Sequence, residues 1–206
     1  MSEVKICNQA LSLVGSLSSN GTIVDLITSL DDDTKEAKLC KLNYELVRDS
    51  VLSEYEWSFA TRWETLPASA NPSPGEFANE YPLPSDVFGV LFVGQDYRHP
   101  QLWQVENNAI RTDATTCKCQ VIYRVEDTSK FSPLFTAALV ARLAAELAIP
   151  ITSSRTLMET LINIYGGKVK LAASKDSQQG RSRRIRSTWL NRARLSGYVG
   201  SAGSYV

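Results

Sequence analysis

Histidine is nearly absent from this chain, which contains only His99. A Ser–His–Asp or Cys–His catalytic set would therefore have to use that one side chain. His99 precedes Pro100 in a polar stretch, which favours a solvated position in a loop. The chain also lacks a glycine-rich phosphate-binding loop. From these absences we predict a protein that is not an enzyme and that carries no cofactor.

Cysteine is scarce as well, with Cys7, Cys40, Cys117 and Cys119 as the only four. The first two lie in helical patterns and the last two in a strand pattern, and we expect all of them to be reduced, structural thiols. A structural metal site usually needs four ligands, and no second cysteine or histidine pair accompanies Cys117 and Cys119. The sequence therefore predicts no metal site.

Three consecutive aspartates, Asp31 to Asp33, could bind a hard cation, but they lack the glycine and the distal glutamate of a calcium loop. Helix capping explains them more simply. Asp33 with Glu36 makes a capping-box pattern, and the negative charges suit the positive end of a helix. We therefore expect a helix over Asp33–Tyr55. The side chains expected to face inward from it are Leu39, Leu42, Leu46 and Val47.

Long apolar runs are rare, so we expect neither a signal peptide nor a membrane span, and synthesis in the cytoplasm. The most apolar stretch is Phe131–Pro150, FSPLFTAALVARLAAELAIP. Ser132 can cap a helix there, and Pro133 suits its first position. The segment is too short, and with Arg142 and Glu146 too charged at its middle, to span a bilayer. It predicts a buried central helix that its last proline stops.

Two more helices are expected near the ends of the chain. Val4–Leu17 has its apolar residues at helical spacing. A fourth helix is expected over about Ser154–Ser177. One stripe of it is formed by Leu157, Leu161, Ile164, Lys168 and Leu171, and it is widened by Met158, Ile162, Tyr165 and Val169.

Between these helices the pattern becomes that of strands. Trp57–Thr61 looks like a strand, or like the end of a helix turning into a strand. Val87–Val93 is apolar and β-branched, which predicts a buried strand. Leu102–Thr112 predicts a hairpin around Asn107-Asn108, a pair that tolerates left-handed turn positions. Lys118–Val125 alternates between apolar and polar residues, as a half-buried strand does.

These expectations give the fold class α+β. We predict a mainly α-helical bundle formed by residues 1–56 and 129–180, a β-rich insertion over residues 57–128, and a basic, extended C-terminal arm over residues 181–206.

The chain has neither a lysine nor an acidic residue after Gly180, but it has six arginines there. The rest of the chain contains the other 16 basic residues and all 22 acidic ones. Its net charge is therefore −6, and that of the tail is +6. On its own this tail should be disordered. Arginine pairs well with carboxylates, and aromatic side chains anchor interfaces, so a protein-docking arm is one interpretation. Its candidate binding residues are Arg181, Arg183, Arg184, Arg186, Trp189, Leu190, Arg192, Arg194, Leu195, Tyr198 and Tyr205.

The same tail fits two other interpretations. Trp189 and Tyr198 could stack on bases in an arm that binds nucleic acid, with the arginines on phosphates. Alternatively, the tail only keeps the protein soluble.

Six short motifs between residues 4 and 180 together carry a resemblance to a known protein family, because they occur in the same order as in that family. They are Ala10–Gly15 (ALSLVG), Tyr55–Arg62 (YEWSFATR), Tyr81–Asp86 (YPLPSD), Ile122–Val125 (IYRV), Phe131–Pro150 with its LAAELA, and Leu171–Asp176 (LAASKD). Their succession resembles the tail tubular protein A family, the head-to-tail connector (adaptor) proteins of short-tailed bacteriophages. Two features depart from the family pattern, since the loop after Gly15 lacks a proline often found there and the arginine-rich tail is not shared.

The resemblance implies a virion structural protein without catalytic activity. It implies a ring, usually of twelve subunits, that docks beneath the portal of the filled capsid and lets viral DNA pass through its lumen without specific binding. The other partners implied are the tail nozzle below the ring and fibres or spikes at its side. In this setting the C-terminal arm is expected to bind the portal.

Two other functions stay open. A nucleic-acid-binding packaging or completion protein would bind duplex DNA through the tail, with strong salt dependence. A cell-wall hydrolase, the less favoured alternative, would need a carboxylate pair in a cleft with one pKa raised. Glu54 with Glu56 and Glu76 with Glu80 are such pairs, but carboxylates are too common for this to be a signal.

Overall fold

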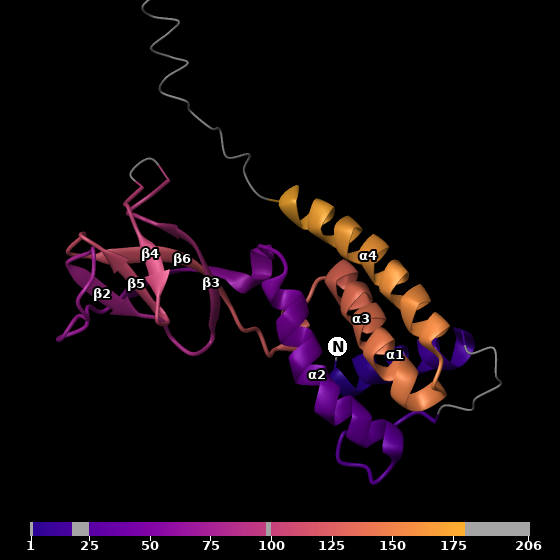
Figure 1. Cartoon of the computed structure of the whole chain (residues 1–206). Coiled ribbons are helices and arrows are strands. Elements are labelled where there is room, and N and C mark those ends of the chain that lie inside the picture. The colour runs from indigo at the N-terminus through magenta and orange to yellow at the C-terminus, as the bar shows by residue number, and fades with distance from the viewer. Residues whose placement is uncertain (1, 18–24, 98–99, 180–206) are drawn as a thin grey trace, which may run out of the picture.

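The computed structural model of the chain describes residues 2–17, 25–97 and 100–179 and has a mixed α+β architecture (Figure 1). The predicted α+β class is therefore confirmed. The helices lie at one end of the molecule in Figure 1 and the strands at the other. In chain order the elements are α1 (Glu3–Leu17), α2 (Lys35–Ser53), β1 (Thr61–Leu66), β2 (Asn79–Pro82), β3 (Val87–Val93), β4 (Gln104–Glu106), β5 (Ala109–Thr112), β6 (Cys117–Tyr123), α3 (Pro133–Thr152) and α4 (Arg155–Ser177).

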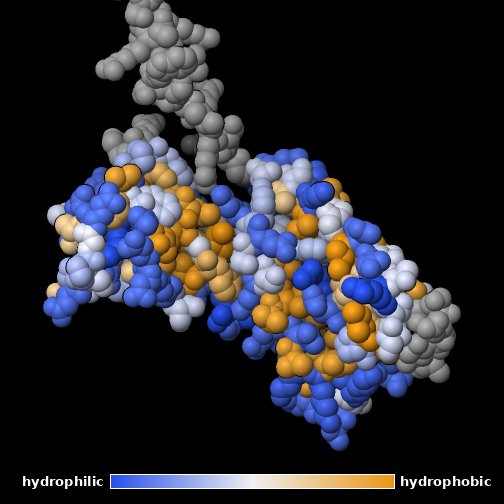
Figure 2. Space-filling model, viewed as in Figure 1, coloured by the Kyte–Doolittle hydropathy of each residue, from blue (hydrophilic) through white to orange (hydrophobic). Residues whose placement is uncertain are grey.

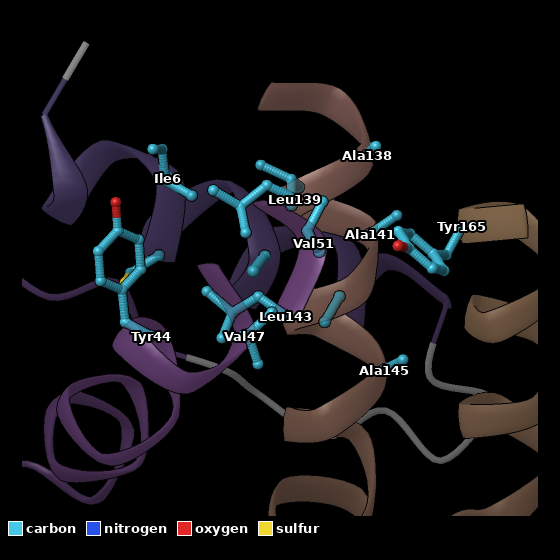
Figure 3. Packing of buried hydrophobic residues seen from close by; sticks show 14 of the residues in the cluster. Ile6, Tyr44, Val47, Val51, Ala138, Leu139, Ala141, Leu143, Ala145 and Tyr165 are labelled. Atoms are coloured by element: carbon cyan, nitrogen blue, oxygen red, sulfur yellow. The ribbon is translucent and has the colours of Figure 1, made fainter. Parts of the chain in front are cut away.

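Helix α3 is the central helix, as its composition predicted. It lies between α4 on one side and α1 with α2 on the other (Figure 3), and its most extensive contact is with α4. Leu139, Leu143 and Leu147 are fully buried, while Ala138 and Ala141 allow the close approach of α4. All four helices contribute to one hydrophobic cluster, so segments from both ends of the sequence build one core.

Both ends of α3 have a local explanation. At the start, the Ser132 hydroxyl accepts the Phe135 N–H at 3.2 Å, as predicted. At the other end, the prediction that Pro150 stops the helix is wrong, because α3 continues to Thr152. A proline in the last turn removes only one hydrogen-bond donor, and Ser153 closes the helix in the left-handed region, with φ 55° and its N–H bonded to the Ile149 carbonyl at 2.8 Å.

The extra turn makes α3 longer than the sequence suggested. With 20 residues it is long and apolar enough to cross a membrane by length and composition alone, so the expectation that it is too short was wrong. Its most apolar window, however, is 61% buried inside the structure. Such burial is typical of the core helix of a folded domain.

Helix α2 begins one residue later than the aspartate run suggested. Thr34, not Asp33, caps it, and the Thr34 hydroxyl accepts the Ala37 N–H at 3.2 Å. Asp33 instead pairs with Lys38 of the first turn. The Asp32 carboxylate accepts the N–H of Ser29 at 2.9 Å and that of Thr28 at 2.8 Å, and these bonds lower the pKa of Asp32. The aspartates therefore shape the entry to the helix.

The strands form two small antiparallel sheets, ordered β1–β6–β3 and β2–β5–β4. The predicted hairpin is confirmed, since Asn107 and Asn108 join β4 to β5 with φ 48° and 58°. Of the two interpretations of Trp57–Thr61, a plain strand is wrong, because Ser58–Ala60 forms a short 3₁₀ helix that leads into β1 at Thr61. Strand β3 is only half-buried, as it lies at a sheet edge. A second hydrophobic cluster fills the space between the sheets and consists of Leu66, Tyr81, Val93, Ile110, Cys117, Cys119 and Val121.

A buried arginine on β5 fixes the long loop between β1 and β2. The Arg111 guanidinium pairs with Glu80 at 3.3 Å and with Glu106 at 3.1 Å, and it also donates to the Ser73 carbonyl. A Cβ atom added at Gly75 would lie 2.5 Å from Arg111 Nη1, so a larger residue at this point would have to displace the guanidinium. The loop is thus attached to the sheet through polar contacts.

Candidate interaction surfaces

The side chains that could bind a metal or react as thiols are considered first, and in the described residues they have structural roles. Within residues 2–17, 25–97 and 100–179, no group of three or more His, Cys, Asp or Glu side chains could hold a metal ion. The four cysteines are buried and free. A hydrogen bond with Cys40, together with burial, raises the pKa of Cys7, and Cys117 acts on Cys119 in the same way. The same hydrogen bonds lower the pKa of Cys40 and of Cys117, but all four thiols are buried. Structural thiols that are buried in this way are inert.

Two of the four glutamates considered for a hydrolase, Glu54 and Glu80, make structural contacts. Glu54 accepts a hydrogen bond from the Tyr165 hydroxyl and so links the end of α2 to α4. Glu80 accepts the Ser73 N–H at 2.8 Å, which lowers the pKa of Glu80, and pairs with Arg111. A hydrolase acid would need a raised pKa, and Glu80 has the opposite shift.

The junction between helices and strands is a dense cluster of specific contacts. Asp176, near the end of α4, is buried and accepts both the N–H and the hydroxyl of Ser58 at 2.7 Å. Trp57 is fully buried, with its indole N–H bonded to the Val51 carbonyl at 2.9 Å. Its ring meets that of Phe135 edge-on at 5.0 Å. Residues far apart in the sequence therefore fix the start of β1 against α3 and α4.

A network of ion pairs also connects the helices to the strands at this junction. Asp49 of α2 pairs with Arg48 at 2.8 Å and with Arg124, just after β6, at 2.9 Å. The Arg124 guanidinium also lies over the Phe88 ring of β3, 5.5 Å from its centre. Helix α2 is thereby tied to the first sheet by charge as well as by apolar packing.

The predicted binding residues of the C-terminal arm lie outside the described residues, as does His99. These are Arg181, Arg183, Arg184, Arg186, Trp189, Leu190, Arg192, Arg194, Leu195, Tyr198 and Tyr205. What the structure does describe is the origin of this segment, since α4 ends at Ser177, next to the Asp176–Ser58 bonds. The described part of the chain therefore ends close to the junction.

Helix α2 has a second apolar face that the sequence analysis assigned to the core. Val47 is buried as predicted and Leu39 is half-buried, but Leu42 and Leu46 are 75% and 72% exposed. The prediction that Leu42 and Leu46 face inward is wrong. The inward line of the helix is formed by Ala37, Cys40, Tyr44, Val47 and Val51. By helical periodicity, Leu42 and Leu46 lie on the opposite side of α2.

Helix α4 departs from its prediction in a similar way. Leu157 and Leu161 are buried as expected and Ile164 is half-buried, but Leu171 is 54% exposed. Tyr165, from the wider part of the predicted stripe, is buried, and this burial raises the pKa of its hydroxyl. Apolar residues are visible on the surface over the helices and over the sheets in Figure 2.

The first sheet carries an aromatic cluster on its outer face. The rings of Trp63, Phe92 and Tyr97 lie 4.8–5.8 Å apart, and the Lys118 ammonium is 5.3 Å from the centre of the Trp63 ring. Trp63 and Phe92 flank Gln120 in register across three strands. This cluster could not be predicted from the sequence, because its residues come together only when β1 and β3 pair with the two edges of β6.

The described residues thus present exposed leucines on α2 and α4, an aromatic cluster on the first sheet, and no metal centre. Comparison of the chain with models of known protein families and with curated proteins finds no match.

Proposed function

We propose that this chain is a virion structural protein, the ring-forming head-to-tail connector subunit that docks beneath the portal of a short-tailed bacteriophage. The ring, of about twelve copies in the family it resembles, continues the DNA channel and is the platform for the tail nozzle, with fibres or spikes at its side. The protein is assembled in the host cytoplasm and resides at the portal–tail junction of the virion. No catalysis is required for this role.

The observation that supports the proposal is that residues from the separate motifs that carry the family resemblance lie together in the structure. Trp57 and Ser58 of the second motif contact Phe135 of the helical motif and Asp176 of the last one. Tyr123 of the IYRV motif donates its hydroxyl to the Phe59 carbonyl at 3.3 Å. Residues quoted from separate stretches thus form one junction, as expected if these stretches belong to one structural unit.

The arrangement of the chain suits this role. In the proposal, residues 1–56 and 129–180 form a helical bundle that packs side by side in a ring, and residues 57–128 are an insertion that reaches the next tail component. The segment 181–206 is the portal-docking arm, which uses its arginines, Trp189 and Tyr198. The acidic body of charge −6 favours a lumen that does not hold DNA.

The test is the mass of the purified full chain alone and with the portal protein of the same virus. We expect a complex of several subunits on each portal, and we expect a variant ending at Gly180 to keep its fold but lose portal binding. The control is Leu102→Ala, at an exposed position before β4, which leaves the arm intact. A monomeric full chain that ignores the portal would contradict the proposal.

The charge of the tail favours one second candidate, a packaging or completion protein that binds nucleic acid. Six arginines without an acidic residue are a strong electrostatic footprint for phosphate. This candidate predicts tight binding of duplex DNA by the full chain, weakened steeply by salt, with no affinity for the portal.

A further inference from the structure

The aromatic cluster on the outer face of the first sheet is only partly covered by the rest of the described chain. Trp63 and Tyr97 are 39% and 46% exposed, and their ring centres lie 5.4 Å apart. The Phe92 ring lies 5.8 Å from that of Trp63 and 4.8 Å from that of Tyr97. The three rings therefore make one continuous apolar surface, and exposed apolar surface of this kind marks an interaction site.

The rings of the cluster accept a cation. The Lys118 ammonium lies 5.3 Å from the centre of the Trp63 ring. The face of an aromatic ring is negative, and arginine, whose guanidinium is planar and weakly hydrated, stacks on it more often than lysine does. On the same sheet, the Arg62 guanidinium lies over the Tyr123 ring at 4.5 Å. The occupant that best fits the cluster is therefore a segment rich in arginine.

Such a segment of the same chain begins close to the cluster. The described residues end at Gln179, and Asp176, just before this end, is bonded to Ser58. Ser58 precedes Trp63 by five positions, and five residues span at most about 18 Å. In Figure 1, the C-terminal end of α4 is the end that points toward the sheets. The C-terminal arm, with its six arginines, therefore follows a point from which a few residues reach the cluster.

The distribution of charge favours the same contact. Residues 57–128, which include all six strands, contain nine acidic and five basic residues and have a net charge of −4. Residues 1–56 and 129–180 together have a net charge of −2, and the C-terminal arm has +6. The part of the chain that carries the aromatic cluster thus contributes most of the negative charge that attracts the arm.

We propose that, in the free protein, the C-terminal arm docks on the aromatic cluster of its own chain, with arginine guanidiniums over the exposed rings of Trp63 and Tyr97. The portal then has to displace the arm from the cluster before it can bind the arm itself. The inference deepens the proposed function, and this regulatory role rests on it, whereas the contact between arm and cluster does not.

Trypsin cleavage of the full chain tests the docking. Trypsin cleaves after arginine, so the cleavage rate within residues 181–206 reports the undocked fraction of the arm. Trp63→Ala should raise this rate about two- to fivefold, the range of one exposed cation–π contact. Lys118→Met removes the cation that already lies on the ring, and it should lower the rate. The matched control is Leu102→Ala, an exposed apolar position outside the cluster, which should not change it.

The opposite signs expected for Trp63→Ala and Lys118→Met separate docking from a loss of stability. General destabilisation of the sheet would raise the cleavage rate in both variants and would contradict the proposal. A rate that is the same in wild type, Trp63→Ala and Lys118→Met would overturn it.

Photo-cross-linking locates the contact. Thr65 is exposed, pairs with Lys118 across the strands and lies two residues from Trp63, on the same face of β1. With benzoylphenylalanine in place of Thr65, we expect peptides from residues 181–206 to be joined to β1 in a product of monomer mass. The same group in place of Leu46 on α2, a matched exposed control, should not capture them. A product of dimer mass only, or no capture of the arm at position 65, would overturn the proposal.

Titration with the portal protein separates this inference from the proposed function. Trp63→Ala should bind the portal about two- to fivefold more tightly than wild type, because a larger fraction of its arms is undocked. A wild-type chain that binds the portal without any cross-link between the arm and position 65 would overturn the inference, while the proposed function would stand. A chain whose arm docks on the cluster but that ignores the portal would overturn the proposed function and the regulatory role, and would leave the contact in place.

Discussion

The helices and the sheets of this molecule are stabilised in different ways. The helices share one large apolar cluster, in which α3 is buried among leucine, alanine and aromatic side chains. The sheets have a smaller apolar cluster, and the loop before β2 is attached by the Arg111 ion pairs and by hydrogen bonds. Apolar burial is insensitive to pH, whereas charge-assisted contacts are not. The two regions should therefore respond differently to mutation and to pH.

The largest effect is expected in the helical core. Leu143→Ala should lower the free energy of unfolding by about 2–5 kcal/mol, because the side chain is fully buried and leaves a cavity. Chemical denaturation measures the change, with Leu42→Ala as the matched exposed control, expected to change stability by less than about 0.5 kcal/mol. Equal losses for the two variants would contradict the assignment of α3 to the core.

An intermediate effect is expected at the junction that joins the two regions. Asp176→Asn replaces a carboxylate that accepts two bonds from Ser58, and hydrogen bonds to charged groups contribute about 1.5–3 kcal/mol. We expect a loss of this order in the free energy of unfolding. Ser58→Ala removes only the hydroxyl donor and should cost less, so a larger loss for Ser58→Ala would show that the carboxylate is not the main acceptor.

The smallest effect should be confined to the sheets and should depend on pH. The Ser73 N–H lowers the pKa of Glu80, so the contribution of Glu80 is present above the ordinary glutamate pKa and is lost as the pH falls through its folded value. We expect the Ser73 amide to lose protection in hydrogen exchange below about pH 4. In Glu80→Gln this protection should no longer depend on pH, and amides of α3 should not change in either protein.

The sequence predicted correctly those features that depend on a few neighbouring residues, such as a helix start and a hairpin turn. Ser132 and Pro133 marked the start of α3, and Asn107-Asn108 marked a hairpin turn, because caps and turns depend on a few neighbouring residues. Leu42 and Leu46 misled the analysis, because α2 is apolar on two faces and periodicity alone does not say which face meets the core.

The contacts of the candidate surfaces depend on residues far apart in the chain. Ser58 and Asp176 are separated by 118 positions, and no local pattern indicates that they bond. The aromatic cluster around Trp63 required the pairing of both β1 and β3 with β6. The role of the C-terminal arm stays a prediction from composition, since its residues lie beyond the described part of the chain.

The order of the elements has a consequence for synthesis on the ribosome. All six strands come from residues 61–123, so the sheets can close as soon as this segment has emerged. The inward faces of α1 and α2 must wait for α3, which ends about 100 residues after α2. At about 5–20 residues per second, this delay is on the order of 5–20 s. During this time the N-terminal helices expose the apolar side chains that later contact α3, and the growing chain is most open to chaperones.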